Sequence, residues 1–280
     1  MTASSESEQV SRLSDRIDTT VAHPARRYNY WLGGKDNFAV DRASGDQIAA
    51  LYPAIRTVAR ENRGFLQRAV RFLAAEAGVR QFLDVGTGIP SADNTHEVAQ
   101  SVAPESRVVY VDNDPMVLVH ARALLASSAA GATAYLDADL RDPERILADA
   151  ELHRTLDLSR PVGLMLIAVA HFLHDDDRPY DLVARLVDAL PSGSYLALSH
   201  VTMDFMPPEI LAQMAAQAAS GRMRTDGYPR SREQVARFFD GLELVEPGIE
   251  AVSRWRPEAP LEDLPPLADT SIYGALARKP

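Results

Sequence analysis

The sequence contains no cysteine among its 280 residues. This absence excludes disulfide bonds, thiolate metal sites and cysteine nucleophiles together. It also fits a reducing cytoplasm, where we expect the protein to be located. The hydrophobic content of 46% is typical of a globular chain and supplies ample material for a core.

Basic charge is scarce as well. Lysine occurs only at Lys35 and Lys279, and the formal net charge at pH 7 is -10. Because nucleic-acid binding relies on a basic surface that neutralises phosphates, this balance disfavours a nucleic-acid partner and favours a small molecule. The preference for arginine over lysine suggests a GC-rich bacterial genome.

Long apolar runs are also missing from the sequence. No stretch reaches the length of about 18 apolar residues that a membrane-spanning helix needs, so we expect no membrane partner. Residues 1–22 are polar and acidic, and they lack the basic start and apolar stretch of a secretory signal. We expect this segment to be a flexible end.

From residue 78 onward, short apolar segments alternate with helical patterns. Near-continuous apolar strands at this spacing predict a parallel sheet that helices cover on both faces. Two further segments near the end predict strands with a hairpin-like return. The expected fold is therefore α/β and Rossmann-like, with a mostly parallel sheet and an antiparallel last strand. The predicted strands read QFLDVG, RVVYVDND, TAYLDADL, PVGLMLIAVAHFL, GSYLALSHV, LELVEPGI and SIYGALARK.

The turn after the first predicted strand, in FLDVGTGIPS, is the first candidate for a ligand site. Ligands of open α/β sheets lie at the carboxyl ends of the strands, and Gly86 and Gly88 allow the backbone around Thr87 to approach a ligand closely. A dinucleotide fingerprint would require glycine where Ser91 stands. The Asp84 carboxylate would repel a pyrophosphate, but it tolerates a cationic sulfonium.

Two more carboxylates follow the next strands. Asp112 closes the second predicted strand and can accept hydrogen bonds from both ribose hydroxyls of a nucleoside, with Asn113 beside it. This feature alone fits NAD and S-adenosylmethionine equally. Asp139 closes the third predicted strand, where it can accept a hydrogen bond from an adenine amino group. We expect Asp114 to cap the helix that begins at Pro115.

The series Asp84-x-Gly86-x-Gly88, Asp112 and Asp139-Leu140 resembles the S-adenosylmethionine site of class I methyltransferases. Over residues 20–280, the segments RRYNYWLGGKDNFAVDR, FLDVGTGIPSADNTHEVAQ, VVYVDNDPMVLVHARALL and LELVEPGI resemble a bacterial family of S-adenosylmethionine-dependent methyltransferases with largely uncharacterised substrates. This resemblance implies S-adenosyl-L-methionine as the cofactor. It also implies methyl transfer to a small-molecule acceptor by in-line displacement.

The N-terminal segment is unusually rich in aromatic residues and contains a Gly-Gly pair. Class I enzymes commonly cover the methionine end of the cofactor with such a segment, so the resemblance implies a lid in which Tyr30, Gly34 and Asn37 contact the cofactor. Arg63 is a candidate to hold the methionine carboxylate by a bidentate bond. The alternatives are an aromatic segment that packs the N-terminal helices on the sheet, and a surface ion pair for Arg63.

His171 is the candidate catalytic residue. It follows the fourth strand, where a class I enzyme places residues beside the transferring methyl group, and a neutral imidazole can take a proton from a hydroxyl or amine. The alternative is that it only packs under the cofactor. His174 and the aspartates that follow it indicate a polar loop and a helix N-terminus rather than a metal site.

These observations predict a flexible segment, 1–22, followed by a single domain, 23–280. The domain is divided into a helical lid (23–77), a cofactor-binding core (78–203), a helical insertion (204–240) and C-terminal strands (241–280). Methionines 206, 214 and 223 of the insertion either line an apolar acceptor pocket or fill the core. Two other functions stay open: a regulatory protein that binds S-adenosylmethionine without catalysis, and a nicotinamide-dependent oxidoreductase. The sequence does not specify the oligomeric state.

Overall fold

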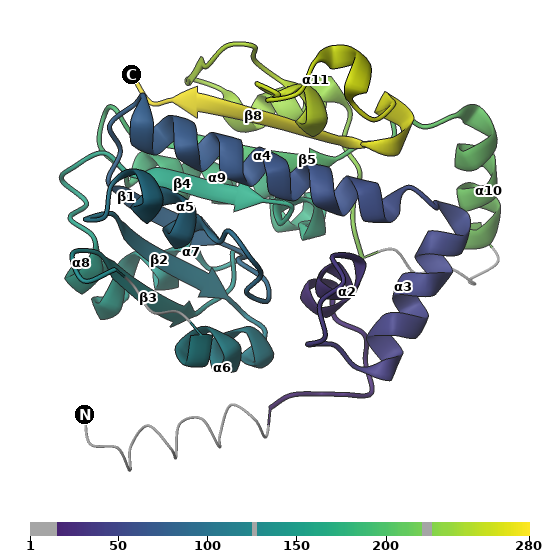
Figure 1. The fold of residues 1–280 in the computed structure, drawn as a ribbon, viewed down its shortest axis with the longest axis horizontal. Coiled ribbons are helices and arrows are strands. Elements are labelled where there is room, and N and C mark those ends of the chain that lie inside the picture. Colours follow the sequence, from purple (N-terminus) through teal and green to yellow (C-terminus); the bar gives the residue numbers. More distant parts are fainter. Residues whose placement is uncertain (1–15, 125–127, 220–225) are drawn as a thin grey trace.

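The computed structural model describes residues 16–124, 128–219 and 226–280, and these contain one eight-stranded sheet (Figure 1). The strand order is β3-β2-β1-β4-β5-β8-β6, and β7 also pairs with β8. The first five strands run parallel, whereas β8 is antiparallel to β5. The expected fold class is therefore confirmed. The strands are β1 (Gln81–Val85), β2 (Arg107–Asp112), β3 (Ala132–Asp137), β4 (Gly163–Ile167), β5 (Tyr195–Val201), β6 (Glu243–Leu244), β7 (Glu250–Ala251) and β8 (Ile272–Arg278).

Helices surround this sheet, and Figure 1 shows α2, α3 and α10 gathered beyond the ends to which the parallel strands point. The carboxyl ends of the strands are therefore enclosed by helices from two distant parts of the chain. No helix in the described ranges is long and apolar enough to cross a membrane. The helices are α2 (Pro24–Trp31), α3 (Ala39–Leu51), α4 (Ile55–Ala75), α5 (Thr95–Val102), α6 (Pro115–Leu124), α7 (Pro143–Ala148), α8 (Ala150–Thr155), α9 (Pro179–Asp188), α10 (Pro208–Ala219) and α11 (Arg232–Ala236).

The core consists of two apolar layers on opposite faces of the sheet. Because side chains alternate along a strand, Leu83 of β1 packs with α9 on one face while Phe82 packs with α4 on the other. On the α4 face, Phe65 and Trp255 are fully buried and meet edge to face, with their ring centroids 5.3 Å apart. Asp84 has the same parity as Phe82, so its carboxylate is directed to the α4 face at the end of β1.

The fourth strand is shorter than the sequence predicts. The apolar run through Leu173 predicted one buried strand, but β4 ends at Ile167 and the chain turns at Ala168, whose φ is 54°. The Ala168 N–H donates to Ser199 Oγ at 2.9 Å, and a 3₁₀ turn, η1 (Ala170–Phe172), follows. A buried turn and a buried strand have the same apolar composition, so hydrophobicity alone does not separate them.

A buried ion pair connects α2 to the carboxyl end of β2. Arg26 donates from Nε and Nη2 to the two oxygens of Asp114, at 3.1 and 2.9 Å. The two residues are only 3% and 1% exposed. Asp114 also accepts the Met116 N–H at 3.0 Å, so it caps α6 as expected. This pair fixes the N-terminal helices to the sheet.

We predict that Arg26→Met lowers the free energy of unfolding by about 3–5 kcal/mol, because it leaves the buried Asp114 carboxylate without its counter-ion. The matched control is Arg71→Met, which breaks an ion pair with Glu258 whose side chains are 53% and 73% exposed, and it should change the stability by less than about 1 kcal/mol. Chemical denaturation measures both values. Equal losses in the two variants would contradict a structural role for the buried pair.

Candidate functional site

A cavity of about 840 Å³ lies at the carboxyl ends of β1, β2 and β4, between the sheet and helices α2 to α4. Its volume is in the range of ligand-binding sites, which span about 300–1,000 Å³. Most of the site residues predicted from the sequence meet in its wall. These are Arg63, Asp84, Gly86, Thr87, Gly88, Asp112, Asn113, Asp139, Leu140 and His171.

The glycine turn presents its backbone to the cavity. Gly86 and Gly88 have φ angles of 76° and 69°, which glycine adopts easily and other residues rarely do. A Cβ on Gly86 would lie 2.2 Å from Val169 Cγ2, so this position admits only glycine. A Cβ on Gly88 would meet nothing closer than Ala25 Cβ at 4.0 Å. The backbone at Gly88 is therefore not crowded by side chains, and it lines the cavity.

Asp112 connects this turn to the end of β2. One of its carboxylate oxygens accepts the Gly88 N–H at 2.8 Å, and the other accepts the Asp114 N–H at 2.9 Å. Burial raises the pKa of the Asp112 carboxyl to about 6, against these hydrogen bonds. A carboxylate has about four acceptor positions, so both oxygens retain capacity for the hydroxyls of a ligand.

Asp84 is bonded to the start of α5 rather than to the glycine turn. Its Oδ2 accepts from Thr95 Oγ1 at 2.6 Å, and burial raises the pKa of its carboxyl to about 6. The nearby Arg63 lowers this pKa in part. Arg63 Nη2 donates to the carbonyls of Ala92 and Asp93 at 2.9 and 2.8 Å. The guanidinium thus supports the loop after the turn and supplies positive charge to the cavity wall.

The third anchor lies in a turn beyond β3, two residues after the strand ends at Asp137. Asp139 accepts from Asn113 Nδ2 at 2.6 Å and from the Arg141 N–H at 2.8 Å. Leu140, which is 5% exposed, adds an apolar surface beside these polar groups. This combination suits a flat ring that needs both an apolar face and a polar edge.

His171 lies in the cavity wall on η1 and is 7% exposed. Burial, with contributions from His200 and Arg230, keeps its pKa well below the ordinary value, so the imidazole is neutral. Its Nδ1 has no hydrogen-bond partner among the described residues. His200 is fully buried behind it, with Nε2 3.0 Å from Arg230 Nη1 and Nδ1 2.8 Å from the Val201 carbonyl.

Three of the predicted residues, Tyr30, Gly34 and Asn37, are outside the cavity lining. Asn37 Nδ2 donates to Asn29 Oδ1 and to the Gly34 carbonyl, both at 2.9 Å. Gly34 is packed against Asn29, since a Cβ there would lie 2.3 Å from Asn29 Nδ2. Tyr30 donates to Asp46 at 2.7 Å. In this structure the contacts of the three residues are made within the N-terminal segment, and they stabilise its local conformation.

Sequence reasoning missed a hydrogen-bonded chain in the cavity wall. Tyr28 Oη donates to the Ala59 carbonyl and accepts from Asn62 Nδ2, both at 2.9 Å. Asn62 Oδ1 in turn accepts from Ser199 Oγ at 2.6 Å. A signal for Asn62 did exist, because it interrupts the buried apolar stripe of α4.

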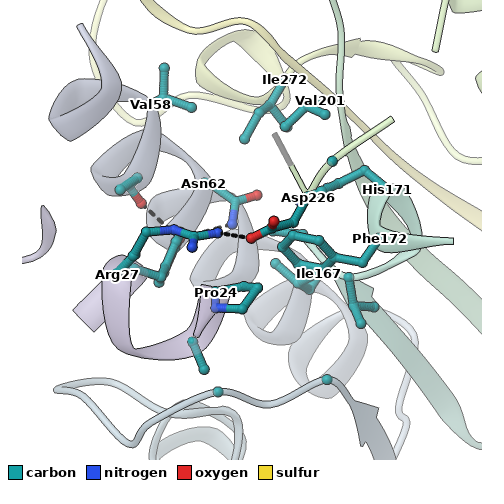
Figure 2. A pocket seen from close by; sticks show the side chains of 18 of the residues that line it. Pro24, Arg27, Val58, Asn62, Ile167, His171, Phe172, Val201, Asp226 and Ile272 are labelled. Atoms are coloured by element: carbon teal, nitrogen blue, oxygen red, sulfur yellow. Dashed lines mark hydrogen bonds and ion pairs between the residues drawn. The ribbon is translucent and has the colours of Figure 1, made fainter. Parts of the chain in front are cut away.

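Sequence reasoning also missed an ion pair between Arg27 of α2 and Asp226, which are 199 positions apart. Figure 2 shows the two side chains pointing toward each other beside Asn62, with His171 and Phe172 on the side of Asp226 away from Arg27. Arg27 is 7% exposed. No local pattern connects residues this distant, so the sequence alone gave no signal for the pair.

The histidine and aspartates after η1 form no metal site in the structure. The His174 N–H donates to Asp177 Oδ2 at 2.8 Å, as in the start of a short 3₁₀ helix. In the part of the chain that the structure describes, no group of three histidine, aspartate or glutamate side chains is arranged to hold a metal ion.

Comparison with known proteins identifies relatives over nearly the whole chain. A family model described as S-adenosyl methyltransferase matches residues 10–280. A crystal structure of a DUF574 family protein from Streptomyces avermitilis is 51% identical, with a TM-score of 0.88, and the match covers 95% of this chain and 100% of that one. A candidate methyltransferase from Thermobifida fusca is 43% identical, with a TM-score of 0.83 and coverage of 94% and 96%. No curated protein matches the chain.

The cavity fits the cofactor of that family. Its lining contains groups of the kind that an adenosine needs: the acceptor oxygens of Asp112 and Asp139, the apolar side chain of Leu140 and the glycine backbone at Gly88. Because the family model matches nearly the whole chain and two solved structures are more than 40% identical to it, the chain belongs to the S-adenosyl methyltransferase family, whose cofactor is S-adenosyl-L-methionine.

Proposed function

We propose that the protein transfers the methyl group of S-adenosylmethionine to a small-molecule acceptor that binds in the same cavity. The observation that carries this proposal is that the cavity lining combines polar residues at the strand ends with mostly apolar residues from the surrounding helices. One part, the cofactor compartment, is lined by 84–88, 112–113 and 138–141, together with Arg63 of α4. The other, the acceptor compartment, comes from α2, α3, α4, α10 and the segments around β5 and β8. Its apolar wall consists of Trp31, Ile48, Leu51, Ile55, Val58, Met203, Met206, Met214 and Ile272.

In the cofactor compartment, each group has a proposed role. Asp112 accepts the ribose hydroxyls, Asp139 accepts from the adenine amino group, and Leu140 packs against the ring. The turn from Gly86 to Gly88 lets the backbone lie close to the cofactor, and Arg63 pairs with the methionine carboxylate. The methionine residues of the insertion support an adaptable acceptor wall, since Met206 and Met214 line the cavity. Met223 is outside the described residues.

The cofactor supplies a methyl group already activated on a sulfonium, so that the S–C bond breaks with its electrons kept by a neutral thioether while an acceptor lone pair forms the new bond. The protein mainly has to position the acceptor in line and exclude water. His171, neutral and in the wall, takes the proton that a hydroxyl or amine acceptor loses. Ser91 in place of the third glycine and the Asp84 carboxylate both disfavour a nicotinamide dinucleotide.

We predict that Asp112→Asn weakens binding of S-adenosylhomocysteine by roughly 10- to 100-fold, because charge-assisted hydrogen bonds to the ribose are lost. The control is Glu144→Gln on α7, which removes an exposed carboxylate paired with Arg185 and leaves the cavity intact. Titration calorimetry on both variants provides the measurement. Unchanged affinity in Asp112→Asn would rule out its ribose contact.

We predict that S-adenosylhomocysteine binding releases protons near pH 6 and weakens as the pH falls from 7.5 to 5. Burial raises the pKa of Asp112 to about 6 in the free protein, whereas hydroxyl donors favour its ionised form and lower the pKa in the complex. Asp84, with a pKa of about 6, adds to the pH dependence if its carboxylate also contacts the cofactor. Calorimetry in two buffers of different ionisation enthalpy measures proton release, which should vanish near pH 8. Affinity that is constant over this range would contradict the assignment.

We predict methyl incorporation from labelled S-adenosylmethionine into at least one member of a panel of phenols, amines and carboxylic acids. For a hydroxyl or amine acceptor, His171→Asn should lower the turnover roughly 10²- to 10⁴-fold, with unchanged cofactor affinity. The outcome that would instead favour the regulatory, non-catalytic alternative is tight cofactor binding with no labelled product from any class. Equal turnover in His171→Asn would remove the proposed base but not the transfer.

A further inference from the structure

The acceptor compartment contains a buried guanidinium with spare hydrogen-bonding capacity. The Arg27 side chain is 9% exposed and lines the cavity. A guanidinium has five N–H donors. Nη2 donates to the Asp226 carboxylate, whereas Nε has no hydrogen-bond partner within the described ranges. A buried arginine with unused donors is costly, so a ligand that supplies acceptors would stabilise it.

The polar groups around Arg27 are already paired with each other. Asn62 uses its amide nitrogen on Tyr28 and its oxygen on Ser199, and Tyr28 donates onward to the Ala59 carbonyl. Figure 2 shows that the other side chains nearby include Val58, Ile167, Val201 and Ile272, which are apolar. Apart from its ion pair with Asp226, the guanidinium therefore lies in a part of the wall that favours a hydrocarbon or aromatic body.

Asp226 is a replaceable partner for this charge. Its side chain is 42% exposed, against 9% for Arg27. Asp226 is thus already partly hydrated and can return to water without a desolvation cost, while the buried Arg27 has to keep an acceptor. Asp226 lies beside His171, because the Tyr228 N–H, two residues later, donates to the His171 carbonyl at 2.7 Å.

We propose that the acceptor is an apolar small molecule with a carboxylate, and that this carboxylate binds Arg27 in place of Asp226. The inference rests on the proposed function, since it names the substrate class of the same cavity. A planar carboxylate matches the guanidinium fork, which makes two parallel hydrogen bonds. The apolar wall binds the body of the acceptor, and the anchored end lies on the side of the cavity that holds the proposed base.

The first experiment compares acids with their uncharged analogues. Protein saturated with S-adenosylhomocysteine is titrated with 3-phenylpropionate and 4-phenylbutyrate, and then with the corresponding primary amides. The acids should bind roughly 10- to 100-fold more tightly than the amides, as expected for charge-assisted hydrogen bonds. Arg27→Met should abolish this preference, and Asp226→Asn should strengthen acid binding by removing the competing carboxylate. Equal binding of acids and amides, or no binding of either, overturns the proposal.

The second experiment tests whether Arg27 serves the methionine carboxylate of the cofactor instead. S-adenosylhomocysteine has this carboxylate and 5′-methylthioadenosine lacks it. Arg27→Met should leave the ratio of the two affinities unchanged, whereas the matched variant Arg63→Met should reduce it. A reduced ratio in Arg27→Met overturns the proposal.

The two proposals fail in different ways. If the wild-type protein does not bind S-adenosylhomocysteine, the proposed function fails. If that ligand binds normally but the acids show no preference, only the inference about the acceptor fails. If Arg27→Met does not fold, the wild type and Asp226→Asn are compared for their binding of acids and amides. An acid affinity that is unchanged in Asp226→Asn would contradict the proposal that the acceptor carboxylate replaces Asp226 at Arg27.

Discussion

The site depends on one carboxylate, that of Asp112, which joins two strand ends through backbone hydrogen bonds. It accepts the Gly88 N–H from the turn after β1 and the Asp114 N–H from the turn after β2. These contacts fix the two turns relative to each other, and the adjacent Asp114 fixes α2 through its buried pair with Arg26. Two residues at the carboxyl end of β2, Asp112 and Asp114, thus position both the cofactor site and the N-terminal helices.

This arrangement places two carboxylates under a desolvation penalty. Burial raises the pKa values of Asp84 and Asp112 to about 6, above the value near 4 of an unfolded chain. A group whose pKa is raised by folding stabilises the folded protein only below its unfolded pKa, and this contribution is lost as the pH rises from about 4 to 6. At neutral pH the free protein therefore holds two ionised groups whose cost hydrogen-bond donors from a ligand would reduce.

Much of the cofactor compartment was predictable because its residues belong to short local patterns. Asp84, Gly86 and Gly88 lie within one strand and turn, and Asp112 is the last residue of a strand that is otherwise mostly apolar. The acceptor compartment was not predictable in the same way. Arg27 and Asp226 meet only through the folded chain, and no pattern in either segment connects them.

The segment around Asn37 is rich in aromatic and polar residues, which suggested contacts with the cofactor. In the structure its asparagine side chains form hydrogen bonds within the segment and do not line the cavity. The sequence composition shows that these polar side chains need hydrogen-bond partners. It does not show whether a ligand or the protein itself supplies those partners.

The chain formed by Tyr28, Asn62 and Ser199 has a consequence for discrimination among acceptors. Each member already makes hydrogen bonds to a neighbour, so this wall has only limited capacity, such as the second amide N–H of Asn62, for an added hydroxyl. A hydroxylated analogue that turned its new group toward this wall would have to compete with these bonds for a partner, and a buried hydroxyl without a partner is penalised strongly. This wall therefore disfavours hydroxylated variants of an acceptor, while Arg27, the proposed anchor, favours a carboxylate.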